Sequence, residues 1–558
     1  MNKKIWTIIG AVLAIGVIAL TAVLIGNNSS SDQATDDEKP SIQKEPQKFN
    51  PEPDPNAKQV TTYHKERITD QEAIEKQLEK DFNPETHTLK DPFIKLDPYG
   101  VAPLTALVKF TTETPAEITL TVQGNDKEST IQKVFEGYNT KHSIPVYGLY
   151  ADKNNTVTLE ATTEDGDDTT TELTIQTEPL PEDFLQVDLV EAQPDKMEPG
   201  LTFINPSSRY TFGVDHNADV RWYSTLWNSH VFKRLENGHI LYITKEEGQE
   251  KYNDLLEMNL LGKVYNAYLF DIGEYDKTNV VHHDVIELPT GNLLATTHDT
   301  ESEYIEDEMV EIDRETGKTV RNFSFQDIFP EEFYKDYDGA LAEDGDWFHQ
   351  NAVWFDDSDN SLIISSRHQD LEMKMTYPEG DIKWILAAHE EWPESFNQYL
   401  LEPTNGAVKF PGGPHAPMTM PDQDNNPDTL DMIYFDNNHV ITRGDEKVSG
   451  EYSRAVQVRI NEKDMTVEEI WSYGEERGRN LFSKIVGDAD YLPETKNRLM
   501  TTGYIAVEEG EDPRNSRIIE VIEDEPAKVL YEIVISGFDK DSHRQAYRAE
   551  RMEVYEGE

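Results

Sequence analysis

Apolar and polar residues alternate along most of the chain after residue 90, which is the pattern of half-buried β-strands. Within residues 91–180 the alternating stretches include "TALVKFTTETPAEITLTVQG", "HSIPVYGLY" and "NTVTLEATTEDGDDTTTELTIQT", and turn residues separate them. Short strands of this kind, rich in Thr and Val, predict a small β-sandwich. The segment has no cluster of His, Asp or Glu with site-like spacing, so it is expected to be an accessory domain.

Residues 181–558 repeat one strand pattern. Five segments, such as "HDVIELPTGNLLATT" and "HQNAVWFDDSDNSLIISS", contain a strand, a turn and a second strand, and another hairpin follows each of them. Four strands per unit are typical of a propeller blade. The stretches "RYTFGVDHNADVRWYS" and "HRQAYRAERMEVYE" would complete a sixth blade together and close the ring. The pattern therefore predicts an all-β protein with a six-bladed β-propeller behind the sandwich.

The first residues have a different pattern. Lys3 and Lys4 precede the 22 uncharged residues 5–26, which are long enough to span a bilayer as a helix. No clear small-residue cleavage site ends this stretch, so residues 1–26 are interpreted as an uncleaved signal anchor. We expect a single-pass protein of the cell membrane with its N-terminus inside and its catalytic domain extracytoplasmic.

Two short regions connect the anchor to the sandwich. Residues 27–62 are acidic and rich in Pro with almost nothing apolar, which predicts a disordered stalk. Residues 63–90 contain "ITDQEAIEKQLEKDF", where Thr69 and Glu72 have the spacing of a capping box. This pattern predicts a short helical segment.

Composition narrows the possible functions. The formal net charge is −57 and the isoelectric point is about 4.5, so nucleic acid is not an expected partner. The absence of cysteine excludes disulfides, thiolate metal sites and a cysteine nucleophile. The oligomeric state is left open, with a homodimer as one possibility.

Histidines recur at one position of the repeat. His230, His283, His349 and His415 each begin the first strand of a predicted blade and are 53, 66 and 66 residues apart. The first strand of a blade lines the central channel of a propeller. Four histidines in equivalent places would therefore form a polar ring at one mouth of the channel, although histidines can also tie blades together structurally.

The third of these segments adds two polar residues. Asn351 is two residues from His349, on the same face of a strand, and a hairpin about Ser358 would place Arg367 opposite His349. Imidazoles with a guanidinium and an amide, without convergent carboxylates, suit a tetrahedral anion. Sulfuryl or phosphoryl transfer to a histidine nucleophile fits this set, with no metal or organic cofactor expected.

Several of these segments resemble the bacterial aryl-sulfate sulfotransferases. The matching pieces include "HHDVIELPTGN", "DWFHQNAVWFDDSDNSLIISSRHQD", "EYSRAVQVRI" and "YRAERM", in the order of that family across about residues 90–555. The resemblance implies a six-bladed propeller that moves a sulfuryl group from an aryl sulfate donor to a phenol acceptor. It also implies that His415 becomes a sulfohistidine, and that the sulfuryl group is bound by His283, His349, Asn351 and Arg367.

The chain departs from that family in two places. It lacks the cysteine pair of some Gram-negative members, and it has "GGPHAP" where those members have Gln before the nucleophile. Either His283 or His349 is expected to protonate the leaving phenolate. Two other interpretations stay open: a non-enzymatic surface propeller that binds an anionic or aromatic ligand, and a hydrolase that uses the histidines as metal ligands.

Overall fold

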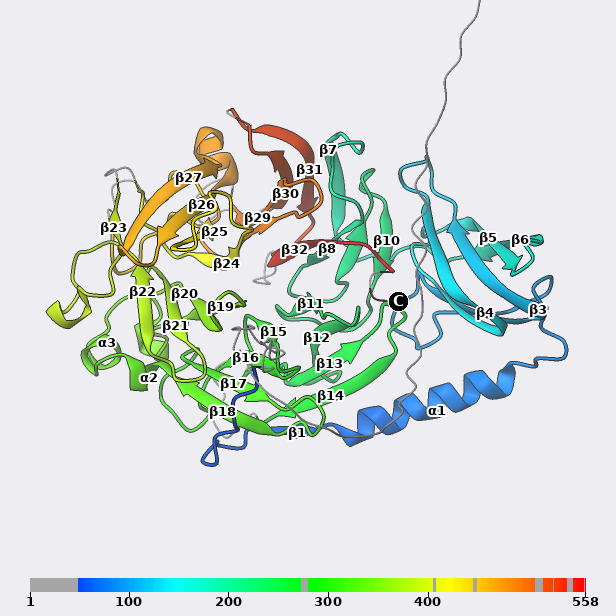
Figure 1. Cartoon of the computed structure of the whole chain (residues 1–558), viewed down its shortest axis with the longest axis horizontal. Coiled ribbons are helices and arrows are strands. Elements are labelled where there is room, and N and C mark those ends of the chain that lie inside the picture. Colours follow the sequence, from blue (N-terminus) through cyan, green and yellow to red (C-terminus); the bar gives the residue numbers. More distant parts are fainter. Residues whose placement is uncertain are drawn as a thin grey trace, which may run out of the picture. The chain divides into compact units, whose positions relative to one another are not determined.

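The structure is a computed structural model, and it describes residues 49–558 except 272–279, 405–407, 445–448, 507–514, 525, 539–544, 556 and 558. Strands account for nearly all of its regular structure (Figure 1). The predicted membrane anchor lies outside the described residues. Within the described ranges, the structure contains no helix that is long and apolar enough to cross a bilayer.

Helix α1 (Lys65–Asp81) lies inside the segment predicted to be helical, and its Leu78 is buried. The predicted capping box is wrong, because the helix begins before Thr69 and the Thr69 hydroxyl donates to the carbonyl of Lys65 at 3.0 Å. The chain already enters the helix at Lys65 because the preceding residues pair as a strand. Shorter helical turns are α2 (Phe325–Ile328), α3 (Glu332–Lys335), η1 (Ala342–Asp344), η2 (Glu394–Phe396) and η3 (Glu475–Leu481).

The last part of the predicted stalk is ordered against the body of the protein. Strand β1 (Thr61–Tyr63) pairs with the edge strand β14 (Val264–Phe270). Before it, the amide of Asp54 donates to the carbonyl of Val320 at 2.9 Å, and the amide of Lys58 donates to Asn322 Oδ1 at 2.8 Å. The disorder predicted for 27–62 therefore does not extend to these residues, because an open sheet edge satisfies their backbone groups.

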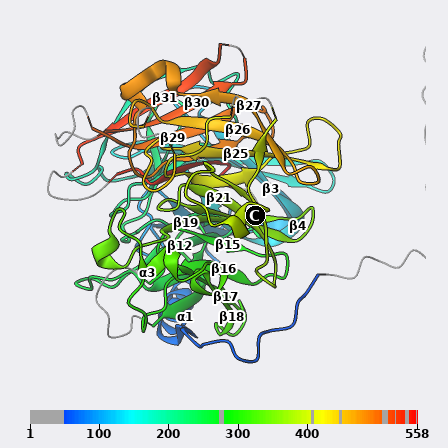
Figure 2. The same cartoon turned by 90° about the vertical axis from the view of Figure 1, so that its left-hand side faces the viewer.

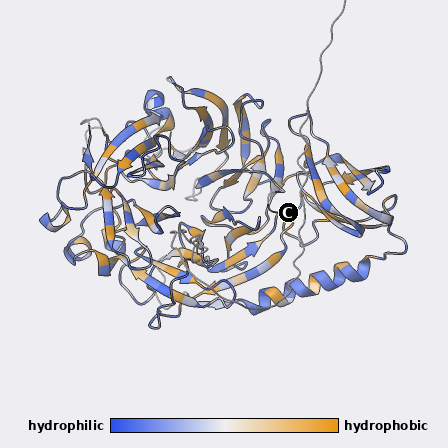
Figure 3. Ribbon diagram, in the orientation of Figure 1, coloured by the Kyte–Doolittle hydropathy of each residue, from blue (hydrophilic) through white to orange (hydrophobic). Residues whose placement is uncertain are grey.

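Residues 93–176 form one hydrogen-bonded sheet. Its strands are β2 (Phe93–Leu96), β3 (Ala106–Val122), β4 (Ile131–Val146), β5 (Asn154–Thr163) and β6 (Asp168–Gln176). Strand β3 links the whole sheet, because its first part pairs with β2 and its second part pairs with β5. The predicted alternation of hydrophobic and hydrophilic residues is visible along these strands in Figure 3.

The remaining strands form six sheets. The first sheet contains β11 (Phe232–Arg234), β12 (Ile240–Thr244), β13 (Asp254–Met258) and β14. The second contains β15 (Val285–Glu287), β16 (Leu293–Thr297), β17 (Glu308–Ile312) and β18 (Thr319–Ser324). The third sheet contains β19 (Gln350–Asp356), β20 (Ser361–Ser366), β21 (Leu371–Thr376) and β22 (Ile382–Leu386). The fourth contains β24 (His415–Thr419), β25 (Thr429–Asp436), β26 (Arg454–Asn461) and β27 (Thr466–Tyr473), with β23 (Glu402–Pro403) at its edge. The fifth sheet contains β28 (Asp488–Tyr491), β29 (Arg498–Ile505), β30 (Asn515–Ile522), β31 (Lys528–Ser536) and β7 (Gln186–Ala192). The sixth contains β32 (Arg548–Met552), β8 (Leu201–Asn205), β9 (Phe212–Val214) and β10 (Val220–Tyr223). The hairpins predicted from the repeat all lie in these sheets, whereas the edge strands β1, β7 and β23 were not predicted.

Each sheet shares buried apolar side chains with the next. Strands β13 and β17 belong to one cluster, β16 and β20 to a second, β20 and β26 to a third, β25 and β29 to a fourth, and β29, β8 and β12 to a fifth. The first strands β15, β19, β24, β28 and β32 contact one another in succession, and both cartoon views draw β15 and β19 near the middle of the molecule (Figures 1 and 2). The predicted union of distant segments in one sheet is confirmed, because β32 lies in the same sheet as the hairpin β9–β10, but the two are joined through β8, which was not predicted.

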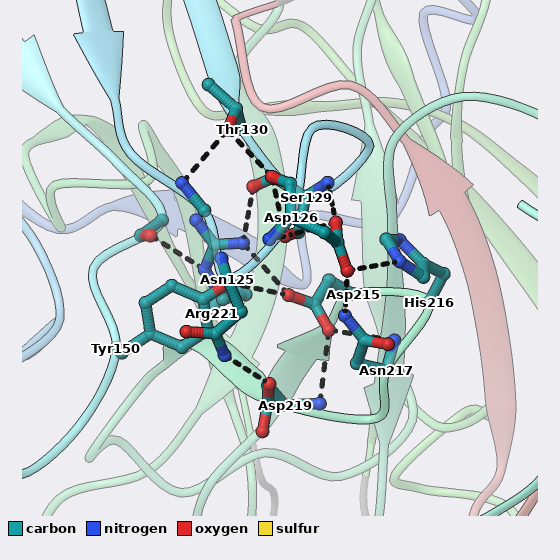
Figure 4. A network of polar contacts seen from close by, with 12 residues as sticks. Asn125, Asp126, Ser129, Thr130, Tyr150, Asp215, His216, Asn217, Asp219 and Arg221 are labelled. Atoms are coloured by element: carbon teal, nitrogen blue, oxygen red, sulfur yellow. Dashed lines mark hydrogen bonds and ion pairs between the residues drawn. The ribbon is translucent and has the colours of Figure 1, made fainter.

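A buried arginine joins the sheet of β2–β6 to the body (Figure 4). Arg221 donates from Nε to the carbonyl of Gly148 and from Nη1 to the carbonyl of Ser129, both at 2.8 Å, and Nη1 lies 2.9 Å from Asp215 Oδ2. Its guanidinium also lies over the ring of Tyr150. Ser129, Gly148 and Tyr150 lie in loops that connect β3 to β4 and β4 to β5, and Asp215 follows β9, so this cluster links the two parts through buried polar contacts.

Candidate active site

His349 and Arg367 face each other across the hairpin β19–β20, as predicted. The amide of Arg367 donates to the carbonyl of His349 at 3.1 Å. His349 has a left-handed backbone with φ of 51°, and the pairing shifts register between Gln350 and Ala352. The simple alternation that was expected to put His349 and Asn351 on one face is therefore broken. Backbone strain of this kind in a residue other than glycine is concentrated at functional sites.

Two carboxylates surround His349. Its Nδ1 lies 2.6 Å from Asp346 Oδ2 and 2.8 Å from Glu306 Oε2. Burial lowers the pKa of His349, but the two carboxylates outweigh burial and raise this pKa to about 9. The expectation that no carboxylates converge on the site is wrong, because Asp346 and Glu306 come from loops that precede β19 and β17. His349 is thus an imidazolium at neutral pH, and we find no partner for its Nε2 among the described residues.

His283 is held at both ring nitrogens. Its Nε2 lies 3.1 Å from Glu306 Oε2, the same oxygen that contacts His349, and its Nδ1 lies 2.9 Å from the hydroxyl of Tyr547. Burial lowers the pKa of His283, although Glu306 opposes the shift. The ring of His230 stacks on that of His283 with centroids 4.9 Å apart and planes 2° apart. Both predicted ring members therefore belong to the cluster, but neither nitrogen of His283 is left for a substrate.

Arg367 is a buried cation without a carboxylate partner. It is 8% exposed, and no carboxylate of the described residues forms an ion pair with it. Its Nη1 donates to Nε2 of His368 at 2.6 Å, whereas its Nε has no hydrogen-bond partner in the described part of the chain. A buried guanidinium with an unused N–H is expected to bind an anion, because leaving such a donor unpaired is costly.

His415 begins β24 and is 1% exposed. Its Nδ1 lies 3.1 Å from the carbonyl of Gly413, which can only accept, so the proton is on Nδ1 and the lone pair is on Nε2. Burial lowers the pKa of His415 well below its ordinary value, and the positive charges of Arg367 and His349 add to this. The result is a neutral imidazole whose Nε2 has no hydrogen-bond partner in the part of the chain that the structure describes.

Polar groups fix the loop before His415 from several sides. The side-chain amide of Asn351 donates to the carbonyl of Pro414 at 2.8 Å. Asn351 therefore contacts this loop, whereas the resemblance implied only that it binds the sulfuryl group. Asp370 accepts from the amide of Gly413 at 2.8 Å and from three further amides in 441–443. Asp436 accepts from the amide of Gly412 at 2.9 Å. These bonds keep the Gly-Gly-Pro loop in one position beside Arg367.

Five residues of the site were missed in the sequence: Glu306, Asp346, His368, Tyr547 and Arg548. Four of them lie in pieces that carry the family resemblance, Asp346 and His368 in "DWFHQNAVWFDDSDNSLIISSRHQD" and Tyr547 and Arg548 in "YRAERM". Arg548 lies 3.0 Å from Asp284 and donates to the carbonyl of Asn351 at 3.1 Å. Glu306 follows an irregular loop with no pattern, so only the folded chain brings it to the histidines.

Two groups of side chains offer the ligand atoms of a metal site. His282, His283 and Glu306 form one group, and Asp346, His349 and His368 form the other. In each group the ligand atoms lie within 4.8 Å of one another. Hydrogen bonds join some of these atoms, such as His283 Nε2 to Glu306 and His349 Nδ1 to Asp346.

The site combines a neutral histidine, a guanidinium that can bind an anion and an imidazolium that can supply a proton, a set that suits a group-transfer enzyme. Comparison with known proteins agrees with this class. The family model "Arylsulfotransferase (ASST)" matches residues 186–548, and the model "Arylsulfotransferase Ig-like domain" matches residues 93–178. The first match covers more than half of the chain, so the chain belongs to the arylsulfotransferase family.

Two curated relatives bear the name arylsulfate sulfotransferase AssT. The protein of Lelliottia amnigena is 24% identical over 77% of this chain and 87% of its own length. The protein of Escherichia coli O6:H1 is 23% identical over 82% of this chain and 93% of its own length. A solved structure from Bacteroides caccae, of unknown function, covers 65% of this chain and 95% of its own at 11% identity, with a TM-score of 0.31 that bears on neither fold nor function. The family excludes the non-enzymatic interpretation, and the chain is an aryl-sulfate sulfotransferase.

Proposed function

We propose that this enzyme moves a sulfuryl group from an aryl sulfate to a phenol in two steps through a covalent sulfohistidine at His415. The observation that carries the mechanism is the pair formed by Arg367 and His415. Arg367, a buried guanidinium with no carboxylate partner among the described residues, lies next to Gly413 in the loop before His415. His415 is a neutral imidazole whose pKa is lowered by burial and then by the charge of Arg367, and its Nε2 has no partner in the same part of the chain. An anionic electrophile would satisfy the guanidinium while it meets the nucleophile.

In the first step His415 Nε2 attacks sulfur and the bond from sulfur to the aryl oxygen breaks. Arg367 stabilises the equatorial sulfuryl oxygens, and the leaving phenolate takes a proton from His349 Nε2. In the second step the acceptor phenol returns a proton to His349, its oxygen attacks sulfur and the nitrogen–sulfur bond breaks. His415 is then neutral again, so no other reactant is needed.

The geometry favours His349 over His283 as the acid. Nδ1 of His349 donates to Asp346, so the second proton of its imidazolium is on Nε2, where it can reach a substrate. The two nitrogens of His283 are already engaged by Glu306 and Tyr547. His283 therefore orients Glu306 and the neighbouring rings, which differs from the direct sulfuryl contact implied by the resemblance.

The test is incubation with 4-nitrophenyl sulfate, with and without added phenol. The ping-pong mechanism predicts a sulfated phenol product, parallel lines in double-reciprocal plots, and a burst of nitrophenol when donor is added alone. Nitrophenol release that does not rise with phenol, together with no sulfated phenol, would refute the transfer.

A metal-dependent mechanism is the second candidate, because the two groups of His and carboxylate side chains described above could hold a cation. It predicts stoichiometric transition metal in the purified protein and loss of activity with a chelator. Elemental analysis with an activity assay after chelation distinguishes the two candidates, since the sulfohistidine mechanism predicts no effect of chelation.

We also propose a six-bladed β-propeller for residues 181–558. The six sheets, the succession of contacts between their first strands, and the pairing of β32 with β8 support it. An experimental structure of the body should show the six sheets around one axis with His283, His349 and His415 at the same mouth of the channel. A different arrangement of the sheets would refute the proposal.

The membrane topology is a separate proposal. The 22 uncharged residues 5–26 after Lys3 and Lys4 support an anchor with an internal N-terminus and an extracytoplasmic body. Protease added to intact cells should then digest residues 49–558. Complete protection of the body would refute this topology.

A further inference from the structure

His368 lies between Arg367 and the backbone of Asp346 and is 0% exposed. Its Nδ1 is 2.6 Å from the carbonyl of Asp346, and its Nε2 is 2.6 Å from Nη1 of Arg367. A carbonyl oxygen only accepts hydrogen bonds, and a guanidinium only donates them. The two contacts are therefore made together only when His368 is neutral, with its proton on Nδ1 and its lone pair directed at Arg367.

The surroundings of His368 agree with a neutral ring. Burial lowers the pKa of His368 well below its ordinary value, and the positive charges of His349 and Arg367 lower it further. The ring stacks on that of His349 with centroids 4.6 Å apart and planes 30° apart. A second imidazolium in this place would meet two cations.

The kind of acceptor matters for Arg367. Buried arginines are usually held by carboxylates, which fix the guanidinium and also cancel its charge. A neutral nitrogen fixes one N–H of the fork and leaves the charge for a ligand. We propose that His368 is the positioning residue of Arg367, a neutral acceptor that orients the guanidinium toward the sulfuryl group without neutralising it. This inference rests on the function proposed above.

Two substitutions separate the two hydrogen bonds of His368. In His368→Gln the side-chain oxygen can replace Nε2 as the acceptor for Arg367. In His368→Asn the shorter side chain can replace only the donor at Nδ1. We expect His368→Gln to keep kcat/KM within about tenfold of wild type, and His368→Asn to lose about 10²-fold, as expected for a misplaced binding group. Benzenesulfonate is an anion without an ester bond to break and should bind as a competitive inhibitor. Its affinity should fall more in His368→Asn than in His368→Gln.

A double-mutant cycle tests whether His368 acts through Arg367. Once Arg367→Ala has removed the guanidinium, adding His368→Asn should change kcat/KM by less than about threefold, because coupled residues are not additive. Additive losses, or equal values for His368→Gln and His368→Asn, would overturn the proposal. If wild type transfers no sulfuryl group at all, the proposed function fails, whereas intact transfer with an additive cycle removes only the role of His368.

A third measurement does not use His368→Asn and therefore still tests the proposal if that variant does not fold. Nitrogen NMR of histidine-labelled protein should show a ring with its proton on Nδ1 throughout pH 5–9 in addition to that of His415, and only this additional signal should disappear in His368→Gln. A signal from His368 that titrates in this range would overturn the neutral acceptor.

Discussion

Replacing Asp346 by Asn removes the closer of the two carboxylates from His349 Nδ1, at 2.6 Å, and leaves Glu306 at 2.8 Å. The pKa of His349, about 9 in the intact site, is then expected to fall toward the ordinary value. At pH 7.5 an imidazole with a pKa of about 9 is about 97% protonated, and one with a pKa of about 6.5 is about 10% protonated. If His349 is the acid, as proposed, kcat/KM should fall by up to about tenfold at this pH.

The assay compares two donors across pH. The loss should be large for phenyl sulfate, whose leaving group needs a proton, and small for 4-nitrophenyl sulfate, whose leaving group is a much weaker base. In wild type, activity toward phenyl sulfate should decline as pH rises through about 9, and in Asp346→Asn the decline should move to lower pH. The matched control is Asp356→Asn, which removes a buried carboxylate that pairs with Lys374 in the same sheet. Equal losses for both donors at every pH would refute His349 as the acid.

Three further predictions concern the nucleophile and the surface. His415→Ala should abolish the sulfuryl adduct of about 80 Da in intact-mass spectra, while Arg367→Ala should keep slow turnover, about 10²- to 10³-fold below wild type; an adduct that persists in His415→Ala would assign the nucleophile elsewhere. Asp370→Asn should lower kcat by about 10- to 100-fold with little change in donor KM, because it loosens the loop before His415, whereas Asp431→Asn, outside the site, should not. The KM of an anionic donor should fall as NaCl rises from about 10 to about 150 mM, because salt screens the net charge of −57, and an unchanged KM would show that the surface charge does not reach the site.

The repeat of hairpins made most of the fold predictable. Local alternation fixes which residues pair, as in β19 and β20, where Asp356 pairs with Ser361 across the predicted turn. The edge strands were missed because β1 and β7 pair with strands that are distant in sequence, and their own patterns are short or largely exposed. Pairing of this kind depends on which sheet edges the folded body leaves open.

The histidines of the site were predictable because they recur with the repeat, and their supporting groups were not. His283, His349 and His415 lie at or just before the first strands of successive sheets, whereas Glu306 reaches two of them from an irregular loop. The backbone of His349, with φ of 51°, departs from the strand geometry that the sequence suggests. Which nitrogen of each ring is free depends on contacts across several sheets, so the choice of acid between His283 and His349 needed the structure.

The pairing of β32 with β8 means that the body is completed only by a segment synthesised more than 300 residues after its partner. Tyr547 and Arg548, at the start of β32, also supply the contacts to His283 and Asp284. Until that segment arrives, the growing chain lacks both the last strand of a sheet and two supports of its catalytic centre. An enzyme built in this way stays inactive and incompletely folded until its last segment has been synthesised.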